Sequence, residues 1–196
     1  MNERRRSECL AAGKLRAWLA EGAPNRLMLT RADFPEDAFS LTELLASFPP
    51  RERLCWRWRS FCAWMGRYTP FCGWKTFWFR RAGASIGKNV FISPGASLDL
   101  LFPQLIVLEE DVVLGLDAML VCHVYTPERI VIGRVIAKKR SLVGGRGILA
   151  IAAIGEEGVL AANSYTLKTI PAGATGIGVP AVIRPRKSSQ RKDDAP

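Results

Sequence analysis

The chain of 196 residues has one histidine, His123, and five cysteines at irregular spacings. Closely spaced cysteine pairs, which structural zinc sites favour, are missing from the sequence, and an odd number does not predict a complete disulfide framework. A catalytic zinc held by three histidines is excluded because there is only one histidine. We therefore expect reduced, mostly structural thiols and no metal site.

Long apolar runs are also missing. No stretch of about 18 uncharged apolar residues occurs, so a membrane-spanning helix is not expected. The first residues, MNERRRSECLAAGKLRAW, are basic but lead into no long apolar stretch, so a signal peptide is not expected either. These two absences make the cytoplasm the expected compartment.

Basic residues are in excess, with 28 Lys and Arg against 18 Asp and Glu, and the formal net charge is +10. Such a charge favours anionic partners, since the summed field of a protein attracts opposite charge. Nucleic acid, an acidic membrane surface and the phosphates of a cofactor all qualify, and charge alone does not choose among them.

A period of six organises the second half of the chain. Aliphatic residues recur at every sixth position at Ile136, Leu142, Ile148, Ile154 and Leu160. An amphipathic helix repeats near 3.6 residues and a half-buried strand near 2, so neither fits. The spacing indicates a hexapeptide parallel β-helix, in which each short strand buries one aliphatic side chain and three hexads complete one coil.

The same period begins near Gly83 and is interrupted twice. It runs through two earlier sets, Ile86, Ile92 and Leu98, then Leu108, Leu114 and Leu120. The two breaks predict two excursions from the prism. The first, LDLLFPQLIV, is apolar and should pack as a bulged coil, whereas the second, VCHVYTPERIVIGRV, is more polar and should project.

One stretch leaves the register open. Arg140 and Arg146 lie four residues after Ile136 and Leu142, in a slot that elsewhere holds a small or aliphatic residue such as Ala96. A slip of one residue would place Ser141 and Gly147 in that slot instead. Both registers are compatible with the sequence between positions 136 and 148.

The segments IGEEGV, LAANSY and TLKTIP, followed by AGATGIGVPAVIR, resemble the C-terminal end of the hexapeptide acyltransferases. That family includes the serine, maltose and galactoside O-acetyltransferases. The resemblance is strongest over 154–184 and extends loosely back to Ala82. It implies a mainly β fold, a left-handed parallel β-helix, assembled as a homotrimer that transfers acetyl groups from acetyl-CoA. We expect this domain over 83–184, after an N-terminal helical segment (1–82) and before a polar tail (185–196).

The N-terminal segment has two parts. Residues 1–50 carry helical patterns, with Ser40 as a candidate N-cap, and should cover the end of the β-helix. Residues 51–81 contain five of the six tryptophans and eight Lys or Arg, with Glu52 as the single acid. This composition suits either a peripheral contact with a membrane surface or packing of helices against the β-helix. No nucleic-acid-binding signature is present, so no nucleic-acid partner is expected.

His123 is the leading catalytic candidate. A lone histidine often has a structural role, but LVCH resembles the catalytic segment of the family, where a histidine acts as general base on a loop. Its neutral imidazole would take the proton of an acceptor hydroxyl during direct transfer. Cys122 is not expected to act as a nucleophile because neighbours on a strand point to opposite faces. Asp117 or Glu128 could orient the imidazole.

The resemblance also implies the positions that contact acetyl-CoA. These are Gly144, Ala162, Leu167, Lys168 and Arg184. Two of them depart from the family pattern: Leu167 replaces a threonine, and GVPAVIR lacks the basic residue that usually stands between Ala and Val. Lys168 and Arg184 could equally be solvated surface charges. Asp99 lies where sugar acetyltransferases often carry an acid that contacts the acceptor.

Together these features predict an acetyl-CoA-dependent O-acetyltransferase acting on a sugar or a lipid-linked saccharide. The alternative is a β-helix without activity that serves as a binding or assembly module. The missing basic residue in GVPAVIR and the sequence LAIAA in place of a usual Gly-Pro turn are the features that support that alternative.

Overall fold

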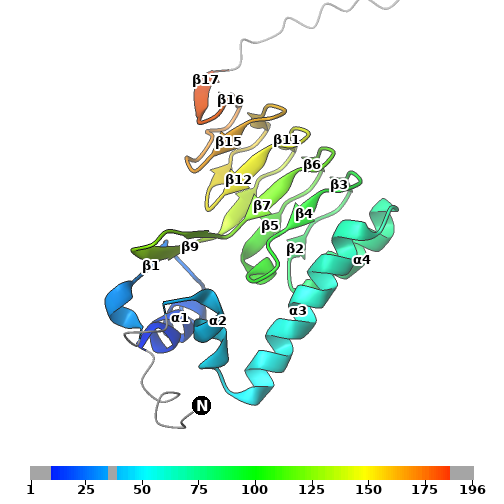
Figure 1. Ribbon diagram of the computed structural model, residues 1–196. Coiled ribbons are helices and arrows are strands. Elements are labelled where there is room, and N and C mark those ends of the chain that lie inside the picture. The colour runs from blue at the N-terminus through cyan, green and yellow to red at the C-terminus, as the bar shows by residue number, and fades with distance from the viewer. Residues whose placement is uncertain (1–9, 35–38, 186–196) are drawn as a thin grey trace, which may run out of the picture.

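The computed structural model describes residues 10–34 and 39–185 (Figure 1). Cys9 and the expected polar tail, apart from Pro185, lie outside these residues. The N-terminal segment contains helices and one strand: α1 (Leu10–Ala20), β1 (Leu27–Thr30), a 3-10 turn (Arg31–Asp33), α2 (Leu41–Ala46), α3 (Pro50–Tyr68) and α4 (Cys72–Ala82). In the described residues, no helix is both long and apolar enough to cross a membrane.

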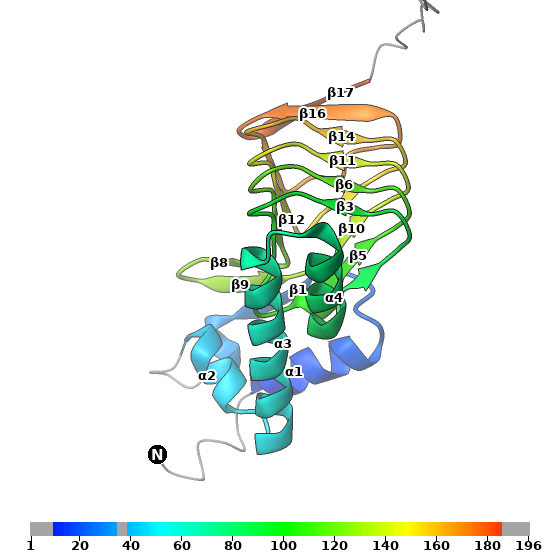
Figure 2. The same cartoon turned by 90° about the vertical axis from the view of Figure 1, so that its right-hand side faces the viewer.

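The second half of the chain forms a parallel β-helix of stacked coils (Figures 1 and 2). The first two coils consist of β2 (Ser85–Ile86), β3 (Phe91–Ile92) and β4 (Ser97–Leu98), then β5 (Ile106–Leu108), β6 (Val113–Leu114) and β7 (Met119–Val121). The next two consist of β10 (Val135–Ala137), β11 (Leu142–Val143) and β12 (Ile148–Ala150), then β13 (Ala153–Ile154), β14 (Val159–Leu160) and β15 (Tyr165–Thr166).

Equivalent strands of successive coils pair in parallel and build three sheets. We call β2-β5-β10-β13 the first sheet, β3-β6-β11-β14 the second and β4-β7-β12-β15 the third. An antiparallel hairpin of β16 (Ala174–Gly178) and β17 (Ala181–Pro185) extends the second sheet at the C-terminal end. The predicted hexapeptide β-helix is therefore confirmed.

The pairing resolves the register between 136 and 148. Ala137 pairs with Leu108, Val143 with Leu114 and Leu149 with Leu120, so these residues continue the inward series. All three are fully buried, whereas Ile136, Leu142 and Ile148 are only partly buried. The inward series drawn through those last three residues is wrong by one position, and the slipped register is confirmed.

The geometry of the corners explains the slip. The third residue after an inward aliphatic residue adopts a left-handed conformation, with φ of 53° at Asn89 and 55° at both Arg140 and Arg146. The next position faces the interior and must be small, and it holds Ser141 and Gly147 in this stretch. A Cβ on Gly147 would lie 2.9 Å from the carbonyl oxygen of Gly144, which is too close. Corner sterics therefore outweigh the larger aliphatic residues of the other register.

Both excursions leave the prism where the sequence predicted. After Leu98 the chain bulges through a 3-10 turn (Pro103–Leu105), and Phe102 is fully buried, so the packed bulge is confirmed. After Val121 it forms a projecting hairpin of β8 (His123–Tyr125) and β9 (Arg129–Ile132), visible at the left of Figure 2. One side of this hairpin is apolar and buried, with Ile130 and Ile132 both fully buried.

The apolar side of the hairpin is covered by the N-terminal segment. Strand β1 pairs with β9 in antiparallel register, with Leu29 opposite Ile130, and both side chains are fully buried. Helices α3 and α4 contact the first coil, and one continuous apolar core joins the helices to the prism. As predicted, Ser40 caps α2, accepting a hydrogen bond from the Glu43 amide at 3.1 Å.

Candidate active site

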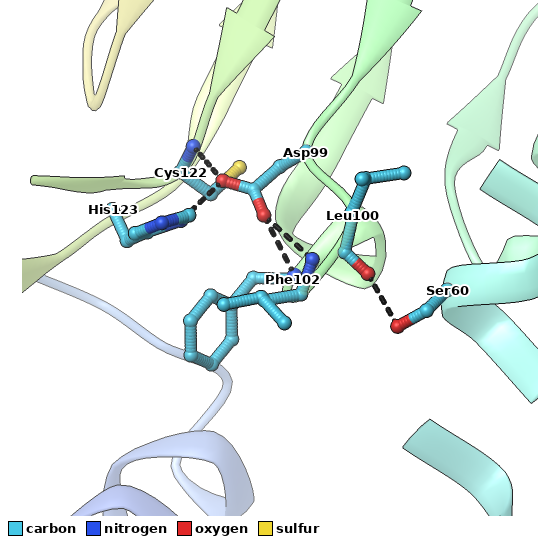
Figure 3. A network of polar contacts seen from close by, with 7 residues as sticks. Ser60, Asp99, Leu100, Phe102, Cys122 and His123 are labelled. Carbon is cyan, nitrogen blue, oxygen red and sulfur yellow. Dashed lines mark hydrogen bonds and ion pairs between the residues drawn. The ribbon is translucent and has the colours of Figure 1, made fainter. Parts of the chain in front are cut away.

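His123 lies at the edge of the third sheet, where β7 ends and the projecting hairpin begins. Its Nδ1 atom is 2.7 Å from Oδ2 of Asp99, which occupies the equivalent corner of the preceding coil (Figure 3). The imidazole remains 24% exposed, whereas the carboxylate is 1% exposed. The arrangement therefore buries the acid and leaves the histidine accessible.

Four donors surround the Asp99 carboxylate. Oδ1 accepts the amides of Leu101 at 2.8 Å and Phe102 at 3.0 Å, and Oδ2 accepts the amide of Cys122 at 2.7 Å as well as His123. Burial by itself would raise the pKa of Asp99, but the bonds from His123 and these amides outweigh it and lower the pKa below its ordinary value. Asp99 is therefore an anion.

The carboxylate fixes the tautomer of the imidazole. An ionised carboxylate only accepts hydrogen bonds, so Nδ1 of His123 must carry the shared hydrogen. In the neutral ring, Nε2 then has the free lone pair. A histidine with a buried acid behind Nδ1 and an unprotonated, accessible Nε2 is suited to act as a general base.

Cys122 is beside the histidine but is chemically inert. Its side chain is fully buried, and burial together with the negative charge of Asp99 raises the pKa of the thiol well above its ordinary value. A thiolate is the nucleophilic form of cysteine, so this residue is not an activated nucleophile. The expectation that no Cys-His nucleophile exists here agrees with this environment.

The bulge that carries Asp99 is attached to helix α3. The Ser60 hydroxyl donates to the Leu100 carbonyl at 2.7 Å (Figure 3). The Phe102 ring lies between two others, with centroid distances of 5.1 Å to Trp56 and 5.8 Å to His123. The helical segment therefore supports the loop on which the acid is placed.

The partner of the imidazole differs from the sequence-based candidates. In the described part of the chain, neither Asp117 nor Glu128 forms a hydrogen bond with His123, and Asp117 lies at a different corner, 4.0 Å from Arg146. Asp99, which was expected to contact the acceptor, has both oxygens occupied by internal donors. The sequence missed this pairing because residues 99 and 123 become neighbours only when the coils stack.

The positions expected to contact acetyl-CoA fall into separate groups. Gly144 and Ala162 lie on adjacent coils at the corner between the second and third sheets, so close that a Cβ on Gly144 would lie 2.5 Å from the Ala162 amide nitrogen. Leu167 and Lys168 follow β15, at the opposite edge of the third sheet. They share that edge with His123, which lies two coils away.

Arg184 is apart from both groups. It lies in β17 opposite Thr175, which pairs in turn with Val159 at the beginning of β14. Ala162 follows the end of that same strand. Within one chain, the structure therefore does not bring Arg184 together with Ala162. Of the two expected basic residues, only the exposed Lys168 lies at the edge that carries Leu167.

Arg26 is a residue that the sequence did not indicate. Its guanidinium donates to the carbonyl of Ile151 at 3.0 Å and to that of Leu167 at 2.7 Å, bridging two coils at the His123 edge. This corner contains only four residues between Leu149 and Ile154, and Ile151 has a φ of 40°. A short corner with an unusual backbone leaves carbonyl groups that need a hydrogen-bond donor, and Arg26 supplies it. In the sequence, the segment LAIAA was the only sign of this irregular corner.

Comparisons with known proteins agree with this architecture. No protein-family model matches the chain. A curated protein of Bacillus subtilis (strain 168), named "Putative acetyltransferase YvoF", is 28% identical over 112 residues, which is 56% of this chain and 65% of that protein. The match thus spans slightly less than two thirds of that relative.

Several solved structures share the fold. A hexapeptide-repeat acetyltransferase of Vibrio cholerae O1 biovar eltor, complexed with acetyl-CoA, has a TM-score of 0.59 and 16% identity, covering 70% of this chain and 91% of its own. A maltose O-acetyltransferase of Clostridium difficile 630 has a TM-score of 0.53 and 14% identity, with coverages of 70% and 90%. A galactoside acetyltransferase in complex with coenzyme A has a TM-score of 0.53 and 12% identity, with coverages of 76% and 92%.

A superposition does not match a coil to its mirror image, so these similarities also bear on the hand of the prism. The expected left-handed parallel β-helix is confirmed with its N-terminal helical segment. The chain therefore has the fold of the hexapeptide-repeat acetyltransferases.

Proposed function

We propose that this protein is an acetyltransferase that uses acetyl-CoA as donor and His123 as general base. The observation that carries the proposal is the buried Asp99 carboxylate bonded to the accessible imidazole at one corner of the β-helix. Acetyltransferases with the same fold, two of them bound to acetyl-CoA or coenzyme A, give this pair its chemical context.

The proposed reaction is a direct transfer. Nε2 of His123 takes the proton of an acceptor hydroxyl as its oxygen attacks the thioester carbonyl. The carbon–sulfur bond then breaks, and the imidazolium returns the proton to the leaving sulfur. Asp99 holds the ring in the required tautomer and stabilises the imidazolium, so no covalent bond to the protein is needed. We propose a saccharide, free or linked to lipid, as the acceptor.

Acetyl-CoA would occupy the surface near Gly144, Ala162, Leu167 and Lys168. Gly144 is buried and lets the coils stack closely at this corner, the neighbouring Ala162 is exposed, and the Lys168 ammonium offers a positive charge for a phosphate. These groups lie on opposite edges of the third sheet. The donor would therefore have to lie across two edges that one prism does not bring together.

A homotrimer removes this difficulty. If the His123 edge of one chain faced the Gly144 edge of the next, each contact would join different surfaces, and a rotation that closes would give a ring. We propose a cyclic trimer in which each donor site lies between two subunits. Light scattering should give three times the mass of 21.7 kDa, and a monomer at micromolar concentration would contradict this assembly.

The decisive experiment follows the release of the CoA thiol from acetyl-CoA over a panel of saccharide and other hydroxyl acceptors. His123→Ala should lower turnover about 10²–10⁴-fold while acetyl-CoA still raises the melting temperature, because the base acts in the chemical step. Arg129→Gln, on the same hairpin, is the matched control and should keep activity. Wild-type turnover in His123→Ala would refute the catalytic role.

The second candidate function is a β-helix that binds or assembles without catalysis. Leu167 in place of a threonine favours it, as does the Arg26 guanidinium bound to the Leu167 carbonyl within the expected donor surface. A protein of this kind would show no thermal stabilisation by acetyl-CoA and no thiol release with any acceptor. The same thermal-shift measurement therefore separates the two functions.

A further inference from the structure

Helices α3 and α4 expose a continuous surface of aromatic rings. Exposed side chains on α3 follow a spacing of three or four residues, with Trp58 49%, Phe61 45% and Tyr68 65% exposed. On α4, Trp74 is 64% and Phe77 48% exposed. Soluble monomers seldom present large contiguous apolar patches without a partner.

The rings are in contact across both helices. Phe61 lies 5.9 Å from Trp58 and 6.3 Å from Trp64 between ring centroids, and it reaches Trp78 on α4 at 6.2 Å. We call the following residues the aromatic face: Trp58, Phe61, Trp64, Tyr68, Trp74, Phe77 and Trp78.

The aromatic face rests on a rigid support. A Cβ on Gly66 would lie 2.4 Å from the Phe79 ring, so α3 and α4 approach each other closely at this point. The buried Lys75 ammonium donates to the carbonyls of Gly66 and Arg67, both at 3.0 Å, and ties α4 to the last turn of α3. The face is therefore formed before any partner arrives.

Positive charge surrounds the rings. The guanidinium of Arg67 lies 5.8 Å from the Tyr68 ring and that of Arg81 lies 5.3 Å from the Phe77 ring. Arg57, also exposed, precedes Phe61 by one helical turn. Residues 51–81 contain eight basic residues and one acid, Glu52, which bonds to Arg16.

We infer that this surface docks on an anionic lipid bilayer, with the two helices lying in the headgroup region. Tryptophan, tyrosine and arginine have apolar bodies and polar tips, so the boundary between headgroups and acyl chains satisfies both parts. Anionic headgroups supply the negative charge that the face itself lacks. Figure 2 shows α3 and α4 side by side at the N-terminal end of the prism, on the side that faces the viewer.

A second copy of the chain related by a two-fold axis is a poorer partner for the same face. In a two-fold interface each patch meets its own equivalent, so the arginines would face arginines. The single acid of the segment, Glu52, is engaged elsewhere and would not relieve that repulsion. Charge complementarity thus selects the bilayer.

The test is co-sedimentation of the full chain with vesicles of phosphatidylcholine alone and of phosphatidylcholine with phosphatidylglycerol. Wild-type protein should sediment with the anionic vesicles and be released as salt rises, because mobile ions screen the attraction. Trp58→Gln with Trp64→Gln and Trp74→Gln should abolish sedimentation. Arg57→Gln with Arg67→Gln and Arg81→Gln should weaken it roughly a hundredfold.

The control variants change residues of the same kinds elsewhere. Lys88→Gln with Arg129→Gln and Lys138→Gln removes the same charge, and Leu10→Gln with Met28→Gln removes exposed apolar groups away from α3 and α4. Both should sediment like wild type, and circular dichroism should show that every variant is folded.

Four results would overturn the inference. The first is failure of the wild-type protein to bind anionic vesicles at low salt. The second is a smaller particle mass for the tryptophan variant by light scattering, because it would identify the face as a contact between copies. The third is equal loss of binding in the charge control, which would reduce the effect to net charge. The fourth is release from vesicles by RNA at stoichiometric amounts, which would favour a nucleic-acid partner.

Discussion

The corner that carries His123 and the helical pair α3 and α4 place their side chains in opposite ways. At the corner a charged carboxylate is buried, and four donors compensate for its lost hydration. On α3 and α4 large aromatic rings are exposed, with no apolar neighbour over them in the described structure. Both arrangements are typical of sites that meet another molecule.

The two regions also differ in how strongly a substitution should disturb folding. The Asp99 carboxylate is fixed by backbone amides of two coils, so a change there disturbs both chemistry and folding. The exposed rings of α3 and α4 lie on a helical pair that packs without them, so a substitution there should change the free energy of unfolding very little. The predictions below separate these two kinds of residue.

Asp99→Asn should have the largest effect. The amide removes the negative charge behind Nδ1 of His123 and turns an amide N–H toward existing donors, so turnover should fall about 10²–10⁴-fold. The apparent KM for acetyl-CoA should change little, since Asp99 is buried away from the expected donor positions. Steady-state kinetics measure both values, and a loss of activity that follows only the unfolded fraction would show that Asp99 has a purely structural role.

The same variant predicts a dependence of stability on pH. The folded-state pKa of Asp99 is lowered, so its stabilising contribution is present above its ordinary pKa of 3.8 and is lost as the pH falls through the folded-state value. The difference in unfolding free energy between wild type and Asp99→Asn should therefore be constant near neutral pH and shrink below about pH 4. Urea unfolding at a series of pH values measures it, and a difference that grows in acid would contradict the assignment.

Two tryptophans of α3 provide the next comparison. Trp56 is 7% exposed and contacts Phe102, so Trp56→Ala should cost about 3–5 kcal/mol of unfolding free energy. Trp58 belongs to the exposed aromatic face, and Trp58→Ala should change that free energy by less than about 0.5 kcal/mol. Denaturant titration of both variants tests this contrast, which fails if the two costs are equal.

A third pair tests the register of the β-helix. Leu149 is fully buried and Ile148 is partly buried on the outer side of the same strand. Leu149→Ala should cost about 2–5 kcal/mol and Ile148→Ala about 1 kcal/mol. Thermal or chemical unfolding reports both costs, and the reverse order would restore the series that runs through Ile136.

Lys168→Ala should have the smallest effect. The exposed ammonium can neutralise one phosphate of the donor without touching the reacting atoms, so the apparent KM for acetyl-CoA should rise about tenfold with little change in turnover. Lys138→Ala, on another exposed turn, is the control. An unchanged KM in Lys168→Ala would identify Lys168 as a solvated surface charge.

Much of the architecture was determined locally by the sequence. A sixfold period is possible only where the chain turns at regular corners, so the β-helix and both excursions were predictable from aliphatic spacing. The positions of the corners were harder to predict, because arginine, unlike glycine, does not indicate a left-handed conformation at Arg140 and Arg146. The sequence left both registers open, and the strand pairing showed that Ser141 and Gly147 hold the inward corner position, where only small residues fit.

The candidate site depended on the tertiary structure. His123 could be selected from the sequence because it is the only histidine and lies on an excursion. Its pairing with Asp99, the burial of that acid and the bridge from Arg26 could not, because stacking of coils brings together residues that are 24 and more positions apart. Composition likewise identified the tryptophan-rich segment, but only helix packing decided that Trp56 enters the core while Trp58 faces outward, since the neighbouring surfaces determine which side of a helix is covered.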